Sequence, residues 1–273
     1  MNRSLNKYLA APYIVWMIGF TVIPLAMIAF YGFTDREGHF TLANVTAIAT
    51  PEHAKALFLS LVLSLASTVI CLLLAYPLAL ILRERGMGKG SFIVFIFILP
   101  MWMNFLLRTM AWQTLLEKNG VINGFLTFLH LPNLAIINTP AAIILGMVYN
   151  FLPFMVLPIY NALAKIDDNV INAARDLGAN NLQVITKILI PLSVPGIISG
   201  INMVFVPALT TFVISTLLGG SKILLIGNII EQEFTKGSNW NLGSGLSLIL
   251  MAFILVNMAL TAKYDKDGEG NAF

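Results

Sequence analysis

The segment Lys165–Pro191, KIDDNVINAARDLGANNLQVITKILIP, is a polar stretch between two long apolar runs of the chain. Asp167 or Asp168 can cap the N-terminus of a helix, where an acidic residue also suits the helix dipole. Gly178 is placed to end that helix in a left-handed turn, a conformation that glycine adopts easily. The segment therefore predicts a short helix and a tight glycine turn between the two apolar runs.

A second helix is predicted directly after the turn. Asn180 and Gln183 have the spacing of a capping box, and the helix that they begin continues into the next apolar run at Ile188–Pro191. The first helix has an apolar stripe at the i, i+4, i+7 and i+11 positions, made of Ile166, Val170, Ala173 and Leu177. The whole segment is thus expected to fold as helix, turn and helix.

Two surfaces could receive this first helix. One is the lipid headgroup layer, on which amphipathic helices lie by means of basic and aromatic side chains. The segment instead balances three basic residues against three acidic ones and has no Trp or Phe. A short helix with small alanine side chains is better shaped for insertion into a groove of another protein. The sequence favours the groove and leaves the lipid surface as the alternative.

Composition sets the context of this segment. The chain has 273 residues, of which 58% are hydrophobic and 11% charged, and its mean hydropathy is +0.84. Soluble domains have about 25% charged residues, so a soluble enzyme is excluded. The net charge is +3 with scattered basic residues, which indicates no nucleic-acid surface. Cys71 is the single cysteine, and it excludes a disulfide framework. The chain is predicted to be an integral membrane protein.

Six apolar runs are long enough to cross about 30 Å of hydrocarbon at 1.5 Å per residue. The predicted fold class is therefore an all-α membrane protein with six transmembrane helices, in a single transmembrane domain over residues 1–273. Several runs contain proline, which predicts kinked helices packed against one another. The six predicted spans are Leu9–Phe33, Phe58–Leu82, Ser91–Leu116, Ala141–Leu163, Ile188–Leu218 and Leu242–Ala262.

The distribution of Lys and Arg predicts the orientation. The two termini, the loop after the second span and the 165–191 segment together carry ten basic residues, whereas the opposite loops carry five. By the positive-inside rule, both termini and the 165–191 segment lie in the cytoplasm. Arg108 remains inside the third predicted span.

The residues of this segment resemble a family motif. NAARDLGA at 172–179 with ILIP at 188–191 is similar to the EAA motif of type I ABC importer permeases, E-A-A, three residues, G, nine residues, I-x-L-P. Asn172 stands in place of the usual Glu, which puts contacts at that position in doubt, and Ile190 replaces Leu. The resemblance implies a MetI-like fold and a coupling helix that docks on an ATP-binding subunit. The ATPase-coupling residues that it implies are Asn172, Ala173, Ala174, Asp176, Gly178, Ile188 and Pro191.

Further stretches look like the spermidine/putrescine permeases of this family: LPMWMNFLLRTMAW at 99–112, PFMVLPIYNALAKID at 153–167 and LLGGSKILLIGNII at 217–230. The resemblance covers nearly the whole chain. It implies a polyamine importer of the inner membrane with a second permease subunit, two copies of an ATP-binding subunit and a periplasmic substrate-binding protein. The chain has no phosphate-binding glycine loop, so ATP and Mg are expected on the partner ATPase, with no cofactor, catalytic residue or metal site on this chain.

A polyamine pathway needs acceptors for ammonium groups and aromatic faces for the methylenes. Most membrane aromatics only pack, so the candidates are hypotheses. Arg108 would repel a polycation and is expected to organise neighbouring helices or a gate, or else to snorkel to the interface. The substrate-pathway candidates are Trp102, Asn104, Arg108, Trp112, Asn150, Phe151, Phe154, Tyr160, Glu231, Glu233 and Trp240.

Other functions stay open at this point. An inorganic anion or iron is the alternative substrate, and Arg108 would suit an anion better than a polyamine. An ion-coupled secondary transporter would need a carboxylate or histidine near the middle of the bilayer, which the predicted spans lack. A membrane-embedded enzyme would need a polar cluster at one depth. His39, His53 and His130 lie in separate predicted external loops and have no spacing typical of metal ligands.

Overall fold

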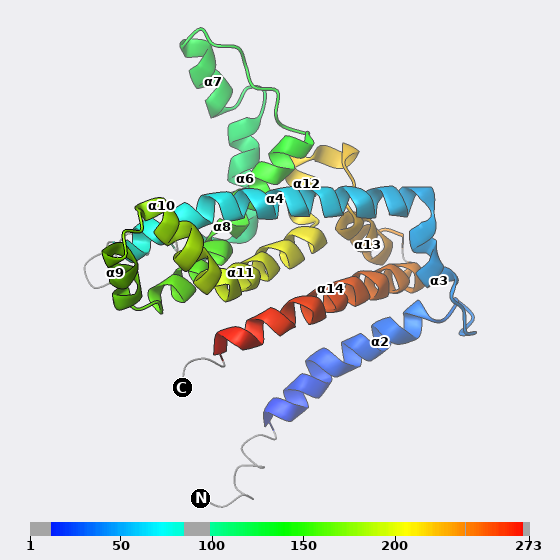
Figure 1. The fold of residues 1–273 in the computed structure, drawn as a ribbon. Helices are drawn as coiled ribbons and strands as arrows, with labels where there is room; N and C mark the ends of the chain where they lie inside the picture. Colours follow the sequence, from blue (N-terminus) through cyan, green and yellow to red (C-terminus); the bar gives the residue numbers. More distant parts are fainter. Residues whose placement is uncertain (1–11, 85–98, 238, 270–273) are drawn as a thin grey trace, which may run out of the picture. The chain divides into compact units, whose positions relative to one another are not determined.

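The computed structural model describes residues 12–84, 99–237 and 239–269 (Figure 1). These residues form helices and turns, with one isolated antiparallel bridge between Thr34 and Phe40. The chain divides into two compact units, residues 1–55 with 229–255 and residues 56–228 with 256–273. Each unit is described by itself.

Helices of very different length alternate along the chain. A helix that begins at Pro12 includes a π-helical turn, η1, and ends with α2. The elements are η1 (Ile18–Val22), α2 (Ile23–Gly32), α3 (Ala43–Thr46), η2 (Ala47–Ala49), α4 (Pro51–Glu84), η3 (Leu99–Trp102), α6 (Phe105–Leu116), α7 (Val121–Phe128), α8 (Pro140–Ala164), α9 (Asp168–Asp176), α10 (Asn181–Val184), η4 (Ile185–Leu189), α11 (Ile190–Thr210), α12 (Val213–Leu218), η5 (Gly220–Lys222), α13 (Ile226–Thr235) and α14 (Trp240–Glu269).

Five described helices are long and apolar enough to cross a membrane. They correspond to the first, second, fourth, fifth and sixth predicted spans, and the second begins several residues earlier than predicted because Pro51 starts the helix and Glu52 suits its first turn. This early start places His53 in a helix and not in a loop. The five helices are Pro12–Gly32, Pro51–Glu84, Pro140–Ala164, Asn181–Thr210 and Trp240–Thr261.

The third predicted span, Ser91–Leu116, is not one continuous helix. Its residues 91–98 lie outside the described residues, and the described remainder consists of η3 and α6 with a break at Met103 and Asn104. Asn104 begins the new helix, because its Oδ1 accepts hydrogen bonds from the backbone N–H groups of Leu106 at 2.8 Å and Leu107 at 3.3 Å. The apolar run thus contains a helix start, which the amide side chain of Asn104 marks.

The fifth predicted span was placed too far along the chain at both ends. The helix begins at Asn181 and ends at Thr210, and α12 follows as a separate short helix. The buried Asn228 holds this break: its Nδ2 donates to Phe212 O at 3.0 Å, and its Oδ1 accepts from Ser215 Oγ at 2.6 Å. Because Asn228 satisfies the polar groups that the break leaves, the chain can turn inside an apolar environment.

The α8–α11 pair forms the centre of the larger unit. Small residues let the two helices approach closely, since a Cβ added at Gly196 would lie 2.6 Å from Pro158 O and 2.5 Å from Ala162 Cβ. Met155 and Val204 are fully buried in the same core. The segment that contains α9 and α10 lies between α8 and α11 in the chain, so this closely packed pair fixes both of its ends (Figure 1).

Helix α4 contributes its small side chains to this core. Cys71, Ala75 and Ala79 are fully buried, and Cys71 has a free thiol. Farther along the helix, Tyr76 Oη and Ser193 Oγ lie 3.1 Å apart and join α4 to α11 by a hydrogen bond. The small side chains on one face explain how a helix of 34 residues packs along its neighbours.

The smaller unit is held by side-chain amides. Asn241 Nδ2 donates to Thr34 O at 2.7 Å, and Asn44 Nδ2 donates to the same oxygen at 2.8 Å. Trp240 packs edge-on against Tyr31 and Phe234. These contacts fix the beginning of α14 to the end of α2.

Candidate functional site

The α9–α10 segment has the local structure that its sequence predicts. Asp167 caps α9, with its Oδ1 accepting from Asn169 N at 2.9 Å. Gly178 follows α9 with φ of +87°, the left-handed region that favours glycine. Asn180 and Gln183 form a reciprocal capping box with two bonds of 2.9 Å. The helix, turn and helix are confirmed, and the second helix continues through η4 into α11.

Three of the four residues of the predicted apolar stripe are exposed, whereas Ile166 is half-buried against the core. Ile171 is the buried residue of α9, with Ala174 half-buried beside the core. Val170 and Ala173, which belong to the stripe, are exposed, and Leu177 is 90% exposed. An exposed stripe on a helix held by its other face is the shape of a docking surface.

The motif residues share this segment but not one environment. Asn172, Ala173, Asp176 and Gly178 are exposed around α9 and its turn, whereas Ala174 and Ile188 are half-buried and Pro191 is exposed at the start of α11. The exposed members are close together in the chain and lie on α9. Ile188 and Pro191 instead belong to the junction between η4 and α11, where they shape the return into the apolar helix.

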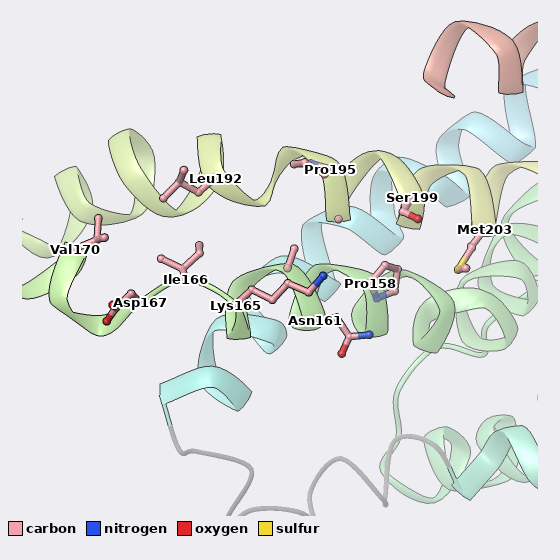
Figure 2. A pocket seen from close by; sticks show the side chains of 12 residues that line it. Pro158, Asn161, Lys165, Ile166, Asp167, Val170, Leu192, Pro195, Ser199 and Met203 are labelled. Carbon is pink, nitrogen blue, oxygen red and sulfur yellow. The ribbon is translucent and has the colours of Figure 1, made fainter. Parts of the chain in front are cut away.

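A groove with a volume of about 550 Å³ lies where α8 and α11 meet the start of α9 (Figure 2). Lys165 runs along it, and Ser199 and Met203 line it from α11. The charged residues of its lining are Lys165 and Asp167, which have opposite signs. The charge of the groove therefore selects neither a cation nor an anion.

A second polar region lies between α6 and α8. Arg108 is 7% exposed, and its guanidinium carbon lies 5.9 Å from the centre of the Tyr149 ring. Trp112 packs edge-on against the same ring with centroids 5.2 Å apart. Arg108 thus contacts the neighbouring helix α8 and is buried. Tyr149 was missed in the sequence, although it stands directly before the candidate Asn150.

Asn150 is 1% exposed and only partly satisfied. Its Nδ2 donates to Gly146 O at 2.8 Å and lies 3.5 Å from Thr109 Oγ1 of α6. Its Oδ1 has no hydrogen-bond partner among the described residues. A buried acceptor without a partner is costly in an apolar environment, so this oxygen marks a place where a donor from outside the chain would be stabilised.

The structure separates the other pathway candidates. Phe151 and Tyr160 are buried in the core of the larger unit, and Phe154 is exposed on α8. Trp102 is exposed at the end of η3, and Asn104 is occupied in capping α6. Glu231, Glu233 and Trp240 belong to the smaller unit, where Glu231 Oε1 accepts from Thr235 Oγ1 at 3.0 Å. The structure brings Arg108, Trp112 and Asn150 together, through Tyr149 and Thr109.

Comparison with protein families identifies the class of the chain. Residues 2–266 match the family described as binding-protein-dependent transport system inner membrane component. The chain belongs to this family and is a permease subunit of an ABC importer of the inner membrane, with no catalytic role of its own. The resemblance in the 165–191 segment is therefore confirmed.

The relatives narrow the comparison. The chain is 36% identical over 266 residues to the spermidine/putrescine transport system permease protein PotB of Haemophilus influenzae, with 93% of each chain covered. It is 38% identical to PotB of Escherichia coli K12, with 86% of this chain and 88% of the relative covered. An inner membrane ABC transporter permease of Escherichia coli K12, YdcU, is 30% identical.

Solved structures have the same fold. A bacterial ABC transporter involved in the import of the polysaccharide alginate matches with a TM-score of 0.81 and 19% identity, over 96% of this chain and 95% of that chain. The MetNI methionine ABC transporter, in inward-facing conformations, matches with a TM-score of 0.56 and 18% identity, over 79% of this chain and 95% of that chain. The chain is thus an all-helical permease with MetI-like structural neighbours.

Proposed function

We propose that the chain is a permease subunit of a polyamine importer that carries spermidine or putrescine. The observation that carries this proposal is the 36% identity over 93% of both chains to a spermidine/putrescine permease. Proteins that share this much sequence over their whole length usually retain the class of substrate. The aromatic side chains around Arg108 and the open Asn150 oxygen support the proposal.

The 165–191 segment is the coupling element within the single transmembrane domain. Its exposed stripe enters a groove of the ATP-binding subunit, which holds ATP and Mg. The seven motif residues already named, from Asn172 to Pro191, shape this contact. The exposure of Leu177 and the left-handed Gly178 turn support this role, because they present α9 outward at a fixed angle. The lipid headgroup layer is the competing surface for the same stripe.

The chain crosses the membrane six times, with both termini and the coupling element in the cytoplasm. The five described spans support this topology, together with the excess of basic residues on one side. The third crossing in this topology includes η3 and α6. The complete importer adds a second permease subunit, two ATP-binding subunits and a periplasmic binding protein.

Transport follows from movement of these helices. Closure of the two ATPases moves α9, which a short turn joins to α8 and which α10 and η4 join to α11. The proline-containing helices α8 and α11 then tilt, and a central path opens to the outside. Release of the hydrolysis products returns the path to the inside. The chain's own work is to conduct substrate and to transmit movement.

The contacts between the membrane spans and a polyamine are weak in this proposal. The five described spans place no Asp or Glu at their centres, so neutral acceptors such as Asn150 and aromatic faces receive the ammonium groups and methylenes. Strong acidic sites would hold a polycation and slow its release. Glu231, Glu233 and Trp240 are candidates at the outer entrance.

The test is uptake by the complete importer in proteoliposomes loaded with ATP. Radiolabelled spermidine or putrescine should accumulate only when the binding protein and ATP are both present. Phosphate, sulfate and ferric iron serve as competitors. Accumulation of one of these ions without polyamine uptake would contradict the substrate assignment, and polyamine uptake driven by an ion gradient without ATP would contradict the importer class.

A further inference from the structure

Arg83 makes an unusual set of contacts at the end of α4. Its Nε donates to Leu163 O at 2.8 Å, and its Nη2 donates to Ile166 O at 2.9 Å. The same Nη2 lies 2.8 Å from Asp168 Oδ1. The Arg83 side chain is only 13% exposed, so these bonds form largely away from solvent. One guanidinium therefore bonds to three acceptors.

These acceptors belong to the junction between a membrane helix and the coupling helix. Leu163 is in the last turn of α8, and its carbonyl also accepts from Ile166 N at 3.2 Å, so that Arg83 gives this oxygen a second donor. Ile166 is in the linker, and Asp168 is the first residue of α9. Arg83 thus connects α4 directly to the end of α8 and the start of α9.

Besides Arg83, packing against the core holds α9, because Ile171 is buried and Ala174 is half-buried against the same core. A polar pocket of about 470 Å³ is lined by residues at the end of α4 and on α9 and α10. The pocket is lined by Asn172, Arg175 and Asn181 as well as Arg83. A helix that faces a cavity can change its tilt more easily than one in a packed core. Arg83 and Asp168 both line this pocket, and the hydrogen bond between them joins α4 to α9 there.

We propose that Arg83 is a positioning residue that fixes the coupling helix to α4, so that movement of α9 is transmitted to α4 as well as to α8 and α11. The proposal rests on the coupling role of α9 given above. The hydrogen bond between Tyr76 and Ser193 gives α4 a second tie, to α11. Helix α4 therefore receives movement from both sides of the coupling segment.

The three bonds of Arg83 differ in how strongly they hold the junction between α8 and α9. Asp168 has a side chain that is 85% exposed, and solvent weakens an ion pair of this kind. The two carbonyl acceptors lie at a helix end, where a bonded cation is also favoured by the helix dipole. The carbonyl bonds should thus hold the junction, with the ion pair adding a small part.

The experiment compares four variants of the assembled importer in proteoliposomes. Arg83→Met removes all three bonds, Arg83→Lys keeps the charge without the planar fork, and Asp168→Asn removes only the ion pair. Lys55→Met is the control, because it removes an exposed basic residue of the same helix, α4, whose side chain makes no hydrogen bond among the described residues. Spermidine uptake per ATP hydrolysed is measured with retention of the ATP-binding subunit.

Arg83→Met should lower uptake per ATP roughly tenfold, the loss expected for a bond to a charged group, while the ATP-binding subunit remains bound. Arg83→Lys should lie between Arg83→Met and the unchanged protein. Asp168→Asn should change the ratio by about twofold at most, and Lys55→Met should match the unchanged protein. An unchanged ratio in Arg83→Met, or an equal loss in Lys55→Met, would overturn the proposal.

A distance measurement separates this proposal from the coupling role itself. Spin labels at Ile81→Cys on α4 and Asn169→Cys on α9 report the junction in the chain without partners, since Cys71 is fully buried. Arg83→Met should broaden the distance distribution, and Asp168→Asn should leave it narrow. A narrow distribution in Arg83→Met would refute the positioning role of Arg83, even if this variant did not assemble with the other subunits of the importer. Failure of the unchanged chain to bind an ATP-binding subunit would refute the coupling role of α9, and the positioning role of Arg83 could still be tested.

Discussion

The proposed coupling segment, residues 165–191, and the polar region between α6 and α8 differ in how their polar groups are satisfied. In the coupling segment, Asp167, Asn180 and Gln183 bond to backbone groups within three residues of themselves. Between α6 and α8, Asn150 bonds to Gly146 and approaches Thr109 of another helix, and its Oδ1 remains open. The capping side chains of the first region find hydrogen-bond partners within that region, which presents an exposed surface. In the second region, one buried acceptor, Asn150 Oδ1, has no partner among the described residues.

This difference suits the two roles proposed for these regions, which are transmission of movement and conduction of substrate. In the proposed coupling role, the 165–191 segment has to keep its shape when an ATP-binding subunit moves it, and local caps give that stiffness. A pathway must hold a passing cation only briefly, and an acceptor that no internal donor occupies can do so. The following predictions test whether stiffness and openness are the properties that matter in each region.

The largest effect is expected for Gly178→Val. Space is open around this glycine, so the cost comes from its φ of +87°, about 1–2 kcal/mol for a residue with a Cβ. The turn should change its angle and uptake per ATP should fall by roughly tenfold. Gly124→Val is the control, because that helical glycine also has open space but no positive φ. Normal coupling in Gly178→Val would show that the angle of the turn is unimportant.

Asn150→Leu should separate function from stability. The change removes a buried acceptor that lacks a partner, so thermal unfolding should be unchanged or shifted upward. Uptake should nevertheless fall by roughly tenfold, because a hydrogen bond to a cation is worth about 1.5–3 kcal/mol. Phe154→Leu, an exposed position on the same helix, is a useful comparison. Full uptake by Asn150→Leu would remove this oxygen from the pathway.

Arg108→Met should destabilise the contact between α6 and α8. A cation above an aromatic ring contributes about 0.5–2 kcal/mol, and Tyr149 is that ring. Thermal unfolding should shift downward by a similar amount in Tyr149→Leu, and the double variant should lose less than the sum of both. Additive losses in this double-mutant cycle would show that the two residues act separately.

Asn180→Ala should have a moderate effect on the coupling segment. Loss of the cap costs about 1 kcal/mol, and the π-helical turn that follows would lose its fixed start. Hydrogen exchange of Gln183 N–H should rise clearly, with a smaller loss of uptake than in Gly178→Val. Exchange as slow as in the unchanged chain would mean that α11 alone orders this turn.

Asp35 lies outside both regions and serves as a control position. Hydrogen bonds from backbone N–H groups, chiefly that of His39, hold the pKa of the Asp35 carboxyl below its ordinary value of 3.8. The loop contact is therefore present above that value and is lost as the pH falls through the lowered pKa. Exchange of the Glu37 and His39 amides should rise only in acid, and Asp35→Asn should leave uptake unchanged at neutral pH. A loss of uptake there would give this loop a role in transport.

The sequence predicts local structure better than contacts between distant residues. The caps at Asp167 and Asn180 and the turn at Gly178 depend on neighbours in the chain, and all three are present. The break at Thr211 depends on Asn228, which lies in a later helix, and hydropathy could not reveal it. Arg83 shows the same limit: in the sequence it is one basic residue among others near a helix end, and only the fold brings it to Leu163 and Ile166.

The central claim is that α9 presents its stripe to an ATP-binding subunit. A photo-crosslinking amino acid at Leu177, which is 90% exposed, tests it in the assembled importer. Phe128 on α7, also exposed and predicted on the opposite side of the membrane, is the matched position. The account predicts a crosslink to the ATP-binding subunit from position 177 and none from position 128. A crosslink from 177 to lipid alone, or to the ATPase from 128, would contradict it.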